Sequence, residues 1–149
     1  WGGGGASHRQ RVTLLHQDPF MFRGSVMANV AYGEKVRGAS WESAESGARA
    51  ALDLSGCAHL VERGARELSG GERKRVAMAR ALAAGAETFL LDEPAAGVDA
   101  ENTERLREVI AALADKEKTI ILSTHQPEWA AHFAEHRISI AYGKIDSLG

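Results

Sequence analysis

Two stretches of this 149-residue chain carry residue types that suit phosphate chemistry. In the first, Ser69 precedes two glycines and Glu72, which is the Ser-x-x-Glu pattern of a helix capping box. The pattern predicts a helix that begins at Gly70, with unpaired backbone N–H groups at its amino end. Gly70 and Gly71 let an anion approach these groups, and the helix dipole favours negative charge there. Many Ser-Gly-Gly turns only start helices, so these residues alone leave both interpretations open.

The second stretch ends a predicted strand in two adjacent carboxylates. Residues 89–91 are apolar, and Asp92 and Glu93 follow them directly before Pro94. In an open α/β sheet the carboxyl ends of the strands face the ligand crevice. Because successive strand residues point to opposite faces, we expect different roles for the two acids. One suits a Mg²⁺ ligand and the other suits a base that accepts a proton from water. The alternative is a turn with two solvated acids.

Two further predicted strands end near polar residues. Residues 11–15 and 119–123 are rich in β-branched and apolar side chains, which predicts buried strands, and Gln17 and His125 follow them. We expect His125 to lie at the same sheet edge as the carboxylates. His132 and His136 stand one helical turn apart, a spacing that also suits a metal. Without a third ligand, surface histidines are the plainer interpretation.

Together these motifs resemble the ATP-binding subunit of ABC transporters. Residues 68–72 are similar to the family's signature motif, with Glu72 where Gln is commoner. Residues 96–99 are similar to its D-loop, Ser123-Thr124-His125 to its switch-histidine loop, and Gln17 stands at its Q-loop glutamine. The resemblance implies ATP and Mg²⁺ as cofactors. It implies roles for these residues: Glu93, His125 and Gln17 in catalysis; Asp92 and Gln17 at the metal; Ser69, Gly70, Gly71, Glu72 and Asp99 at the nucleotide.

The resemblance also implies partners and a location. In the family two ATPase domains sandwich ATP, and transmembrane permease subunits dock near the position of the apolar cluster 20–22, for which ordinary core packing is the alternative. We expect an importer-like subunit at the cytoplasmic face of the membrane, held there through its partners. The formal net charge is −2, so the sequence gives no general attraction to nucleic acid. Three basic residues, 73–75, are more typical of a solvated helix face. No apolar run approaches the roughly 20 residues that cross a bilayer.

The expected fold is α/β. We predict a mostly parallel sheet of the P-loop-NTPase type with an inserted helical subdomain, truncated at the amino end. Residues 1–10 form a flexible tail, residues 11–33 and 86–149 form the α/β core, and residues 34–85 form the helical subdomain with the signature helix. Further expected elements are a helix from residue 26 that Gly33 stops, a helix over 41–52 that Gly56 stops, a helix for which Asp99 is the N-cap, and a hairpin over 137–145.

The sequence lacks one motif of the family. A phosphate-binding P-loop needs Gly-x-x-x-x-Gly-Lys followed by Ser or Thr, and no lysine precedes Lys35. We therefore expect residues 1–149 to bind ATP weakly and to show no appreciable turnover alone. The alternative function is a non-catalytic clamp or regulatory partner, which supplies a signature motif to an intact ATPase and hydrolyses nothing itself.

Overall fold

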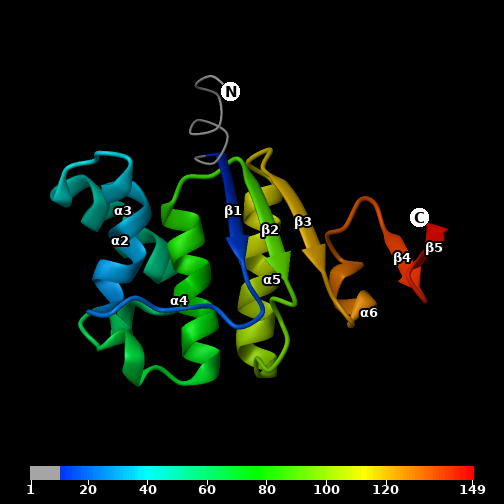
Figure 1. The fold of residues 1–149 in the computed structure, drawn as a ribbon, viewed down its shortest axis with the longest axis horizontal. Coiled ribbons are helices and arrows are strands. Elements are labelled where there is room, and N and C mark those ends of the chain that lie inside the picture. Colours follow the sequence, from blue (N-terminus) through cyan, green and yellow to red (C-terminus); the bar gives the residue numbers. More distant parts are fainter. Residues whose placement is uncertain (1–10) are drawn as a thin grey trace.

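The computed structural model describes residues 11–149, and the expected tail over residues 1–10 lies outside the described residues. Helices and strands alternate along the chain in the order that Figure 1 shows. Their bounds are β1 (Val12–Leu15), α2 (Val26–Val36), α3 (Trp41–Leu54), η1 (Ala58–Leu60), η2 (Ala65–Glu67), α4 (Gly70–Ala83), β2 (Thr88–Asp92), α5 (Ala100–Ala114), β3 (Thr119–Ser123), α6 (Pro127–Ala130), β4 (Ile138–Ala141) and β5 (Lys144–Leu148).

The main sheet within residues 11–149 has three strands in the order β1-β2-β3, and both pairings are parallel. Val12 lies opposite Thr88, and Thr88 lies opposite Thr119. All three strands therefore end at the same edge of the sheet (Figure 1). This arrangement confirms the α/β class and the parallel sheet.

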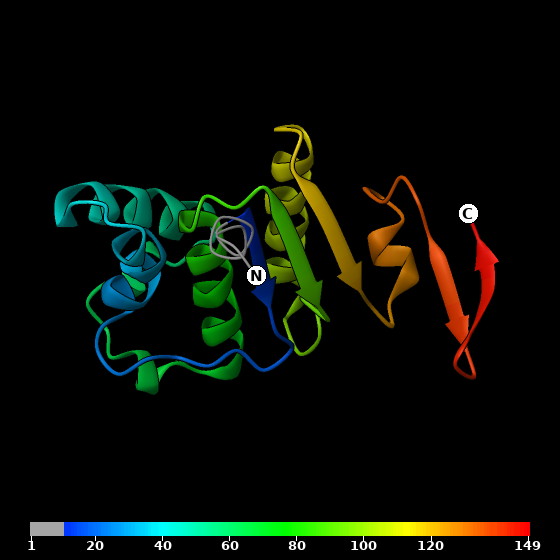
Figure 2. The same ribbon diagram turned by 45° about the horizontal axis from the view of Figure 1, so that its top comes forward.

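The two faces of this sheet are covered unequally. Phe89 and Leu91 point to the face that packs against the core, where α4 contacts β1 and α5 contacts β3. On the other face Leu14 is 59% exposed and Ile121 is 60% exposed. We expected β1 and β3 to be buried strands, and for this face that expectation is wrong. The reason is that α4 and α5, the helices that contact the sheet, pack against its other face, and Figure 2 shows α5 behind the strands.

Helices α2, α3 and α4 pack against one another beside the sheet. The prediction that Gly33 ends its helix is wrong, since α2 continues to Val36. Gly33 has another role, because a Cβ at this position would lie 3.2 Å from the Cβ of Ala84. The missing side chain therefore lets α2 approach the end of α4 closely. Helix α3 ends at Leu54 before Gly56, whose φ is +66°, as the sequence predicts.

The last described element is the predicted hairpin, in which β4 pairs with β5 in antiparallel fashion. Tyr142 and Gly143 form its turn, with φ values of +51° and +73°. Positive φ at both central residues is typical of a tight hairpin turn that matches strand twist. Separately, no helix among residues 11–149 combines the length and the apolar character that a membrane crossing requires.

Candidate active site

The carboxyl ends of the three parallel strands bring the predicted site residues to one edge. Gln17 follows β1, Asp92 ends β2 with Glu93 directly after it, and His125 follows β3. The sheet itself fixes this placement, because its parallel register carries Leu15, Leu91 and Leu122 side by side. The edge joins acids, an imidazole and an amide, which can bind a cation, accept a proton and orient a phosphate.

Asp92 and Glu93 are both held by Ser123 of the neighbouring strand. Ser123 Oγ donates a hydrogen bond of 2.7 Å to Asp92 Oδ1. The backbone N–H of Glu93 donates to the carbonyl oxygen of Ser123 at 3.1 Å. Glu93 has a φ of +46°, a left-handed conformation that non-glycine residues seldom adopt and that is often found at functional sites.

Glu93 and His125 face each other across the ends of β2 and β3. His125 Nε2 lies 3.3 Å from Glu93 Oε1. The Glu93 side chain is only 13% exposed, whereas that of His125 is 95% exposed. The glutamate is thus sheltered and the imidazole stands over it, open to solvent. This arrangement suits a base beside a group that contacts an incoming ligand.

Gln17 lies exposed in the loop after β1, next to Asp18. Asp18 also approaches Arg73 of α4, with 3.8 Å between its Oδ1 and Arg73 Nη1. Both side chains of this pair are solvent-exposed, so the pair contributes little stability. It nevertheless places the Gln17 loop beside the first turns of the signature helix.

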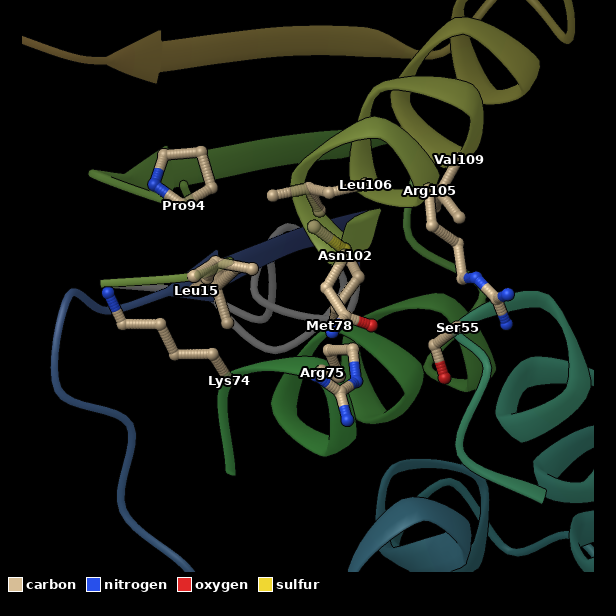
Figure 3. A pocket seen from close by; sticks show the side chains of 11 residues that line it. Leu15, Ser55, Lys74, Arg75, Met78, Pro94, Asn102, Arg105, Leu106 and Val109 are labelled. Carbon is tan, nitrogen blue, oxygen red and sulfur yellow. The ribbon is translucent and has the colours of Figure 1, made fainter. Parts of the chain in front are cut away.

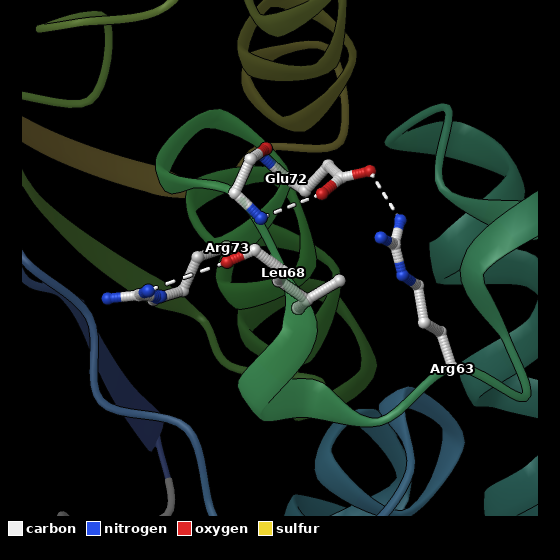
Figure 4. A network of polar contacts seen from close by, with 5 residues as sticks. Arg63, Leu68, Glu72 and Arg73 are labelled. Atoms are coloured by element: carbon white, nitrogen blue, oxygen red, sulfur yellow. Dashed lines mark hydrogen bonds and ion pairs between the residues drawn. The ribbon is translucent and has the colours of Figure 1, made fainter.

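The amino end of α4 has the predicted capping box. Ser69 Oγ accepts a hydrogen bond from Glu72 N at 3.3 Å, and Glu72 Oε2 accepts one from Ser69 N at 2.8 Å. Arg63 adds an ion pair of 3.0 Å to Glu72 Oε1, and Arg73 donates to the carbonyl oxygen of Leu68 at 3.5 Å (Figure 4). The backbone N–H of Ser69 is the largest influence that holds the pKa of Glu72 below its ordinary value, and Arg63 acts in the same direction.

Gly70 and Gly71 stand in open space at this helix end. A Cβ on Gly70 would meet no atom within 4 Å, and one on Gly71 would come no closer than 3.8 Å to Arg75. Neither residue has a positive φ. Their lack of side chains is therefore not required by packing or backbone geometry among residues 11–149, and it leaves the helix terminus open to a ligand.

The charge of Glu72 makes this helix end sensitive to pH. Because the folded pKa is lowered, the carboxylate stabilises the fold above its unfolded pKa, whose ordinary value is 4.5. That stability is lost as the pH falls through the folded pKa. Relative to Glu72→Gln, we expect the unchanged protein to be more stable by about 0.3–1 kcal/mol at pH 7, and the difference to vanish in acid. Urea unfolding of both proteins from about pH 7 down to acidic pH measures this difference in stability. A difference that grows in acid would contradict the stabilising role of the Glu72 carboxylate.

The predicted D-loop connects the site to two helices. Asp99 caps α5, since its Oδ1 accepts a hydrogen bond of 3.0 Å from Asn102 N, and the Asn102 side chain donates to both of its oxygens. These bonds hold the pKa of Asp99 below its ordinary value, the backbone bond most strongly. Lys74 of α4 donates to the carbonyl oxygen of Ala96. The signature helix and the D-loop are therefore joined within one chain.

A small apolar pocket lies behind this edge, between α4 and α5 (Figure 3). Lys74 and Arg75 reach it from α4, Leu106 and Val109 from α5, and Pro94 from the loop after β2. Its volume is about 20 Å³, which is room for about one water molecule. A nucleotide does not fit there, so this pocket is not a candidate nucleotide site.

Sequence reasoning missed the role of Ser123 at the carboxylates. Asp92 and Ser123 meet because they form the last pair of the β2–β3 register. The sequence does carry a weak signal, since a hydroxyl residue ends the strand after three apolar residues, but the sequence does not give the register. The histidines at 132 and 136 are exposed, and the structure brings no group of three potential metal-binding side chains together among residues 11–149.

Comparison with known proteins identifies the family. The family model described as ABC transporter matches residues 4–96. The chain belongs to the ABC transporter family. Among its ABC transporter relatives, the phosphate import ATP-binding protein PstB 1 of Vibrio cholerae is 35% identical over 142 residues, which are 92% of this chain and 52% of that protein. The energy-coupling factor transporter ATP-binding protein EcfA2 of Streptococcus pyogenes is 37% identical over 142 residues, 93% of this chain and 51% of that one.

Solved ABC transporter structures share the fold. CbiO1 from Clostridium perfringens, part of the ABC transporter complex cbiONQ, superposes with a TM-score of 0.83 at 25% identity over 97% of this chain and 59% of that one. The ATP-binding cassette MJ0796, a dimer bound to ADP and Pi, superposes with a TM-score of 0.86 at 25% identity, over 97% of this chain and 65% of that one. The chain spans about half the length of the curated ABC transporter relatives it matches.

Proposed function

We propose that this chain is part of an ATP-hydrolysing subunit that powers an importer-like ABC transporter. The observation that carries the proposal is the edge where three parallel strands end, with Glu93 facing His125 at 3.3 Å and Asp92 fixed beside them. A turn with two solvated acids does not account for the sheltered Glu93 or for its left-handed backbone. The expected division into a core over 11–33 and 86–149 and a helical subdomain over 34–85 is part of this proposal.

The donor set at the edge fits Mg²⁺ and a nucleotide. Mg²⁺ prefers oxygen ligands and is commonly held by one or two protein groups together with substrate phosphates. Asp92 and Gln17 supply such oxygens, and a larger cluster of acids is not needed. Bound Mg²⁺ would polarise the terminal phosphate and balance its charge. A P-loop, which residues 1–149 do not contain, would complete the phosphate contacts.

The other residues of the edge have distinct tasks in this proposal. Glu93 accepts the proton of the attacking water, since its carboxylate is sheltered and oriented at the end of β2. His125 donates to the terminal phosphate from its exposed position. Gln17 orients the water. Its loop contacts α4 through the ion pair between Asp18 and Arg73.

The signature end of α4 serves a nucleotide held by a second ATPase domain. Ser69, Gly70 and Gly71 offer a capped, open helix terminus. Among residues 11–149 no hydrogen bond or ion pair joins this terminus to Glu93 or His125, which fits a role toward a partner's nucleotide. The D-loop, which ends in Asp99, follows Glu93 and Pro94 in the chain and is tied to α4 through Lys74, which donates to the carbonyl oxygen of Ala96.

Permease subunits are the second partner in this proposal. A hollow of about 320 Å³ lies beside the Gln17 loop, between the loop after β1 and the segment before α4, and its lining includes Phe20 and Arg66. Buried Asn29 fixes the chain just beyond this rim of lining residues, because its side chain bonds both the N–H and the carbonyl oxygen of Phe22. Exposed aromatic rings and arginines at such a rim suit a protein partner. This docking places the subunit at the cytoplasmic face of the membrane.

Mixed dimers test the assignment of the signature motif. In full-length dimers with Ser69→Arg in one protomer only, we expect the partner's nucleotide site to lose its hydrolysis and the mutated protomer's own site to keep its nucleotide binding. The bulky cation blocks the open helix terminus without touching the strand edge. Single-turnover hydrolysis and nucleotide stoichiometry measure both effects. Ser40→Arg, at the N-cap of α3, is the matched control. Loss confined to the mutated protomer's own site would contradict action on the partner's nucleotide.

A further inference from the structure

Ser123 contacts both acids of the candidate site. It ends β3 opposite Asp92, as the last pair of the parallel register. The Ser123 hydroxyl donates a hydrogen bond of 2.7 Å to Asp92 Oδ1. The backbone N of Glu93 lies 3.1 Å from the carbonyl oxygen of Ser123 and 3.4 Å from its Oγ. The last residue of β2 and the glutamate directly after it are thus both tied to one residue of the next strand.

The hydroxyl has a task that the backbone of residue 123 does not perform. The bond from Glu93 N to the carbonyl oxygen survives any side chain at this position, so the hydroxyl acts mainly on Asp92. The terminal torsion of an aspartate is broad, and a single short bond to one oxygen fixes the plane of the carboxylate. An ionised carboxylate has about four acceptor positions, so Oδ2 and the remaining lone pairs stay available to a cation.

We propose that Ser123 is a positioning residue that orients Asp92 for the metal. The inference rests on the proposed function, in which Asp92 binds Mg²⁺. The three preceding residues of β3, Ile120, Ile121 and Leu122, are apolar, and Ser123 is the hydroxyl residue of β3 that lies opposite the acid. It also ties the strand that leads to His125 directly to the metal-binding acid. A displacement at the end of β3 therefore moves the carboxylate and the histidine together.

Metal affinity, measured without turnover, tests this role. The probe is Mn²⁺ titrated by electron paramagnetic resonance into the full-length protein with a non-hydrolysable ATP analogue. Outer partners of metal ligands typically contribute about 10–100-fold to affinity, so we expect Ser123→Ala to weaken Mn²⁺ binding by that factor. Ser123→Thr keeps the donor on an exposed strand end and is expected to stay within about twofold of the unchanged protein.

Two controls separate this inference from the function it rests on. Thr119→Val removes a hydroxyl from the other end of β3 and is expected to leave Mn²⁺ affinity unchanged. Asp92→Asn tests the metal ligand itself. If Asp92→Asn weakens Mn²⁺ binding and Ser123→Ala does not, the role of Ser123 is wrong and the site stands. If neither variant weakens it, the metal assignment of Asp92 is wrong. Equal losses in Ser123→Ala and Thr119→Val would show a general effect of the strand and overturn the positioning role.

Discussion

Replacing Glu93 by glutamine is expected to lower ATP hydrolysis by the full-length protein about 10² to 10⁴-fold, which is about 3 to 5 kcal/mol of transition-state stabilisation. Glutamine keeps the shape of the side chain but does not accept the proton of the attacking water. Nucleotide binding should largely survive, since the lost step is proton transfer. Single-turnover hydrolysis and equilibrium binding of ATP measure the two effects separately.

The matched control for this change is Glu87→Gln. Glu87 lies just before the other end of β2, is exposed and pairs with Arg11, so its replacement alters charge by the same amount far from the strand edge. We expect it to leave hydrolysis unchanged. Equal single-turnover rates for Glu93→Gln and the unchanged protein would remove Glu93 as the base. The non-catalytic clamp would then be the better description of the chain.

Replacing Phe89 by alanine is expected to destabilise the fold by about 3–5 kcal/mol. Phe89 is 1% exposed and sits in the middle strand of the sheet, where its ring packs into the core. Its removal leaves a cavity in addition to the lost burial. Domains are usually stable by only about 5–15 kcal/mol, so this single change removes a large part of the total.

Urea unfolding of the full-length protein and its variant measures this loss as a shift of the transition midpoint. Phe20→Ala is the matched control, because this ring is 72% exposed, and we expect a change within about 0.5 kcal/mol. A midpoint for Phe89→Ala that matches the control would show that the ring does not contribute to the core. Because Phe89 lies in β2, a lowered midpoint would also show that the strand that carries Asp92 unfolds in this transition.

Much of the framework could be predicted from local sequence. The capping box at Ser69, the N-cap at Asp99 and the stop at Gly56 each act within one helical turn, and the structure confirms all three. Apolar runs ending in polar residues located β2 and β3, and the parallel sheet then brought the polar residues to one edge. Local hydrogen bonding and side-chain periodicity are properties of the sequence itself, which is why these predictions succeeded.

Features that depend on distant contacts could not be predicted in this way. Gly33 resembles a helix stop, but its missing side chain lets Ala84 approach from another helix. Leu14 and Ile121 have the composition of buried strand residues, yet both are exposed, because no helix of residues 11–149 covers their face. The bond from Ser123 to Asp92 requires the strand register, because a shift of one residue would point the hydroxyl to the other face.

The order of strands in the sheet also has a consequence for how the chain folds. The pairing of β1 with β2 brings residues 12 and 88 together, whereas the pairing of β2 with β3 brings together residues 88 and 119, which are closer in the sequence. Each doubling of a flexible loop adds about 0.6 kcal/mol to the entropic cost of closing it. The longer of these two connections contains helices α2, α3 and α4, which contact one another. If these helices pack first, the entropic cost of bringing β1 to β2 is smaller. We expect β2 and β3 to pair first across the shorter loop, so that Asp92, Glu93 and His125 come together before β1 brings Gln17 to the same edge.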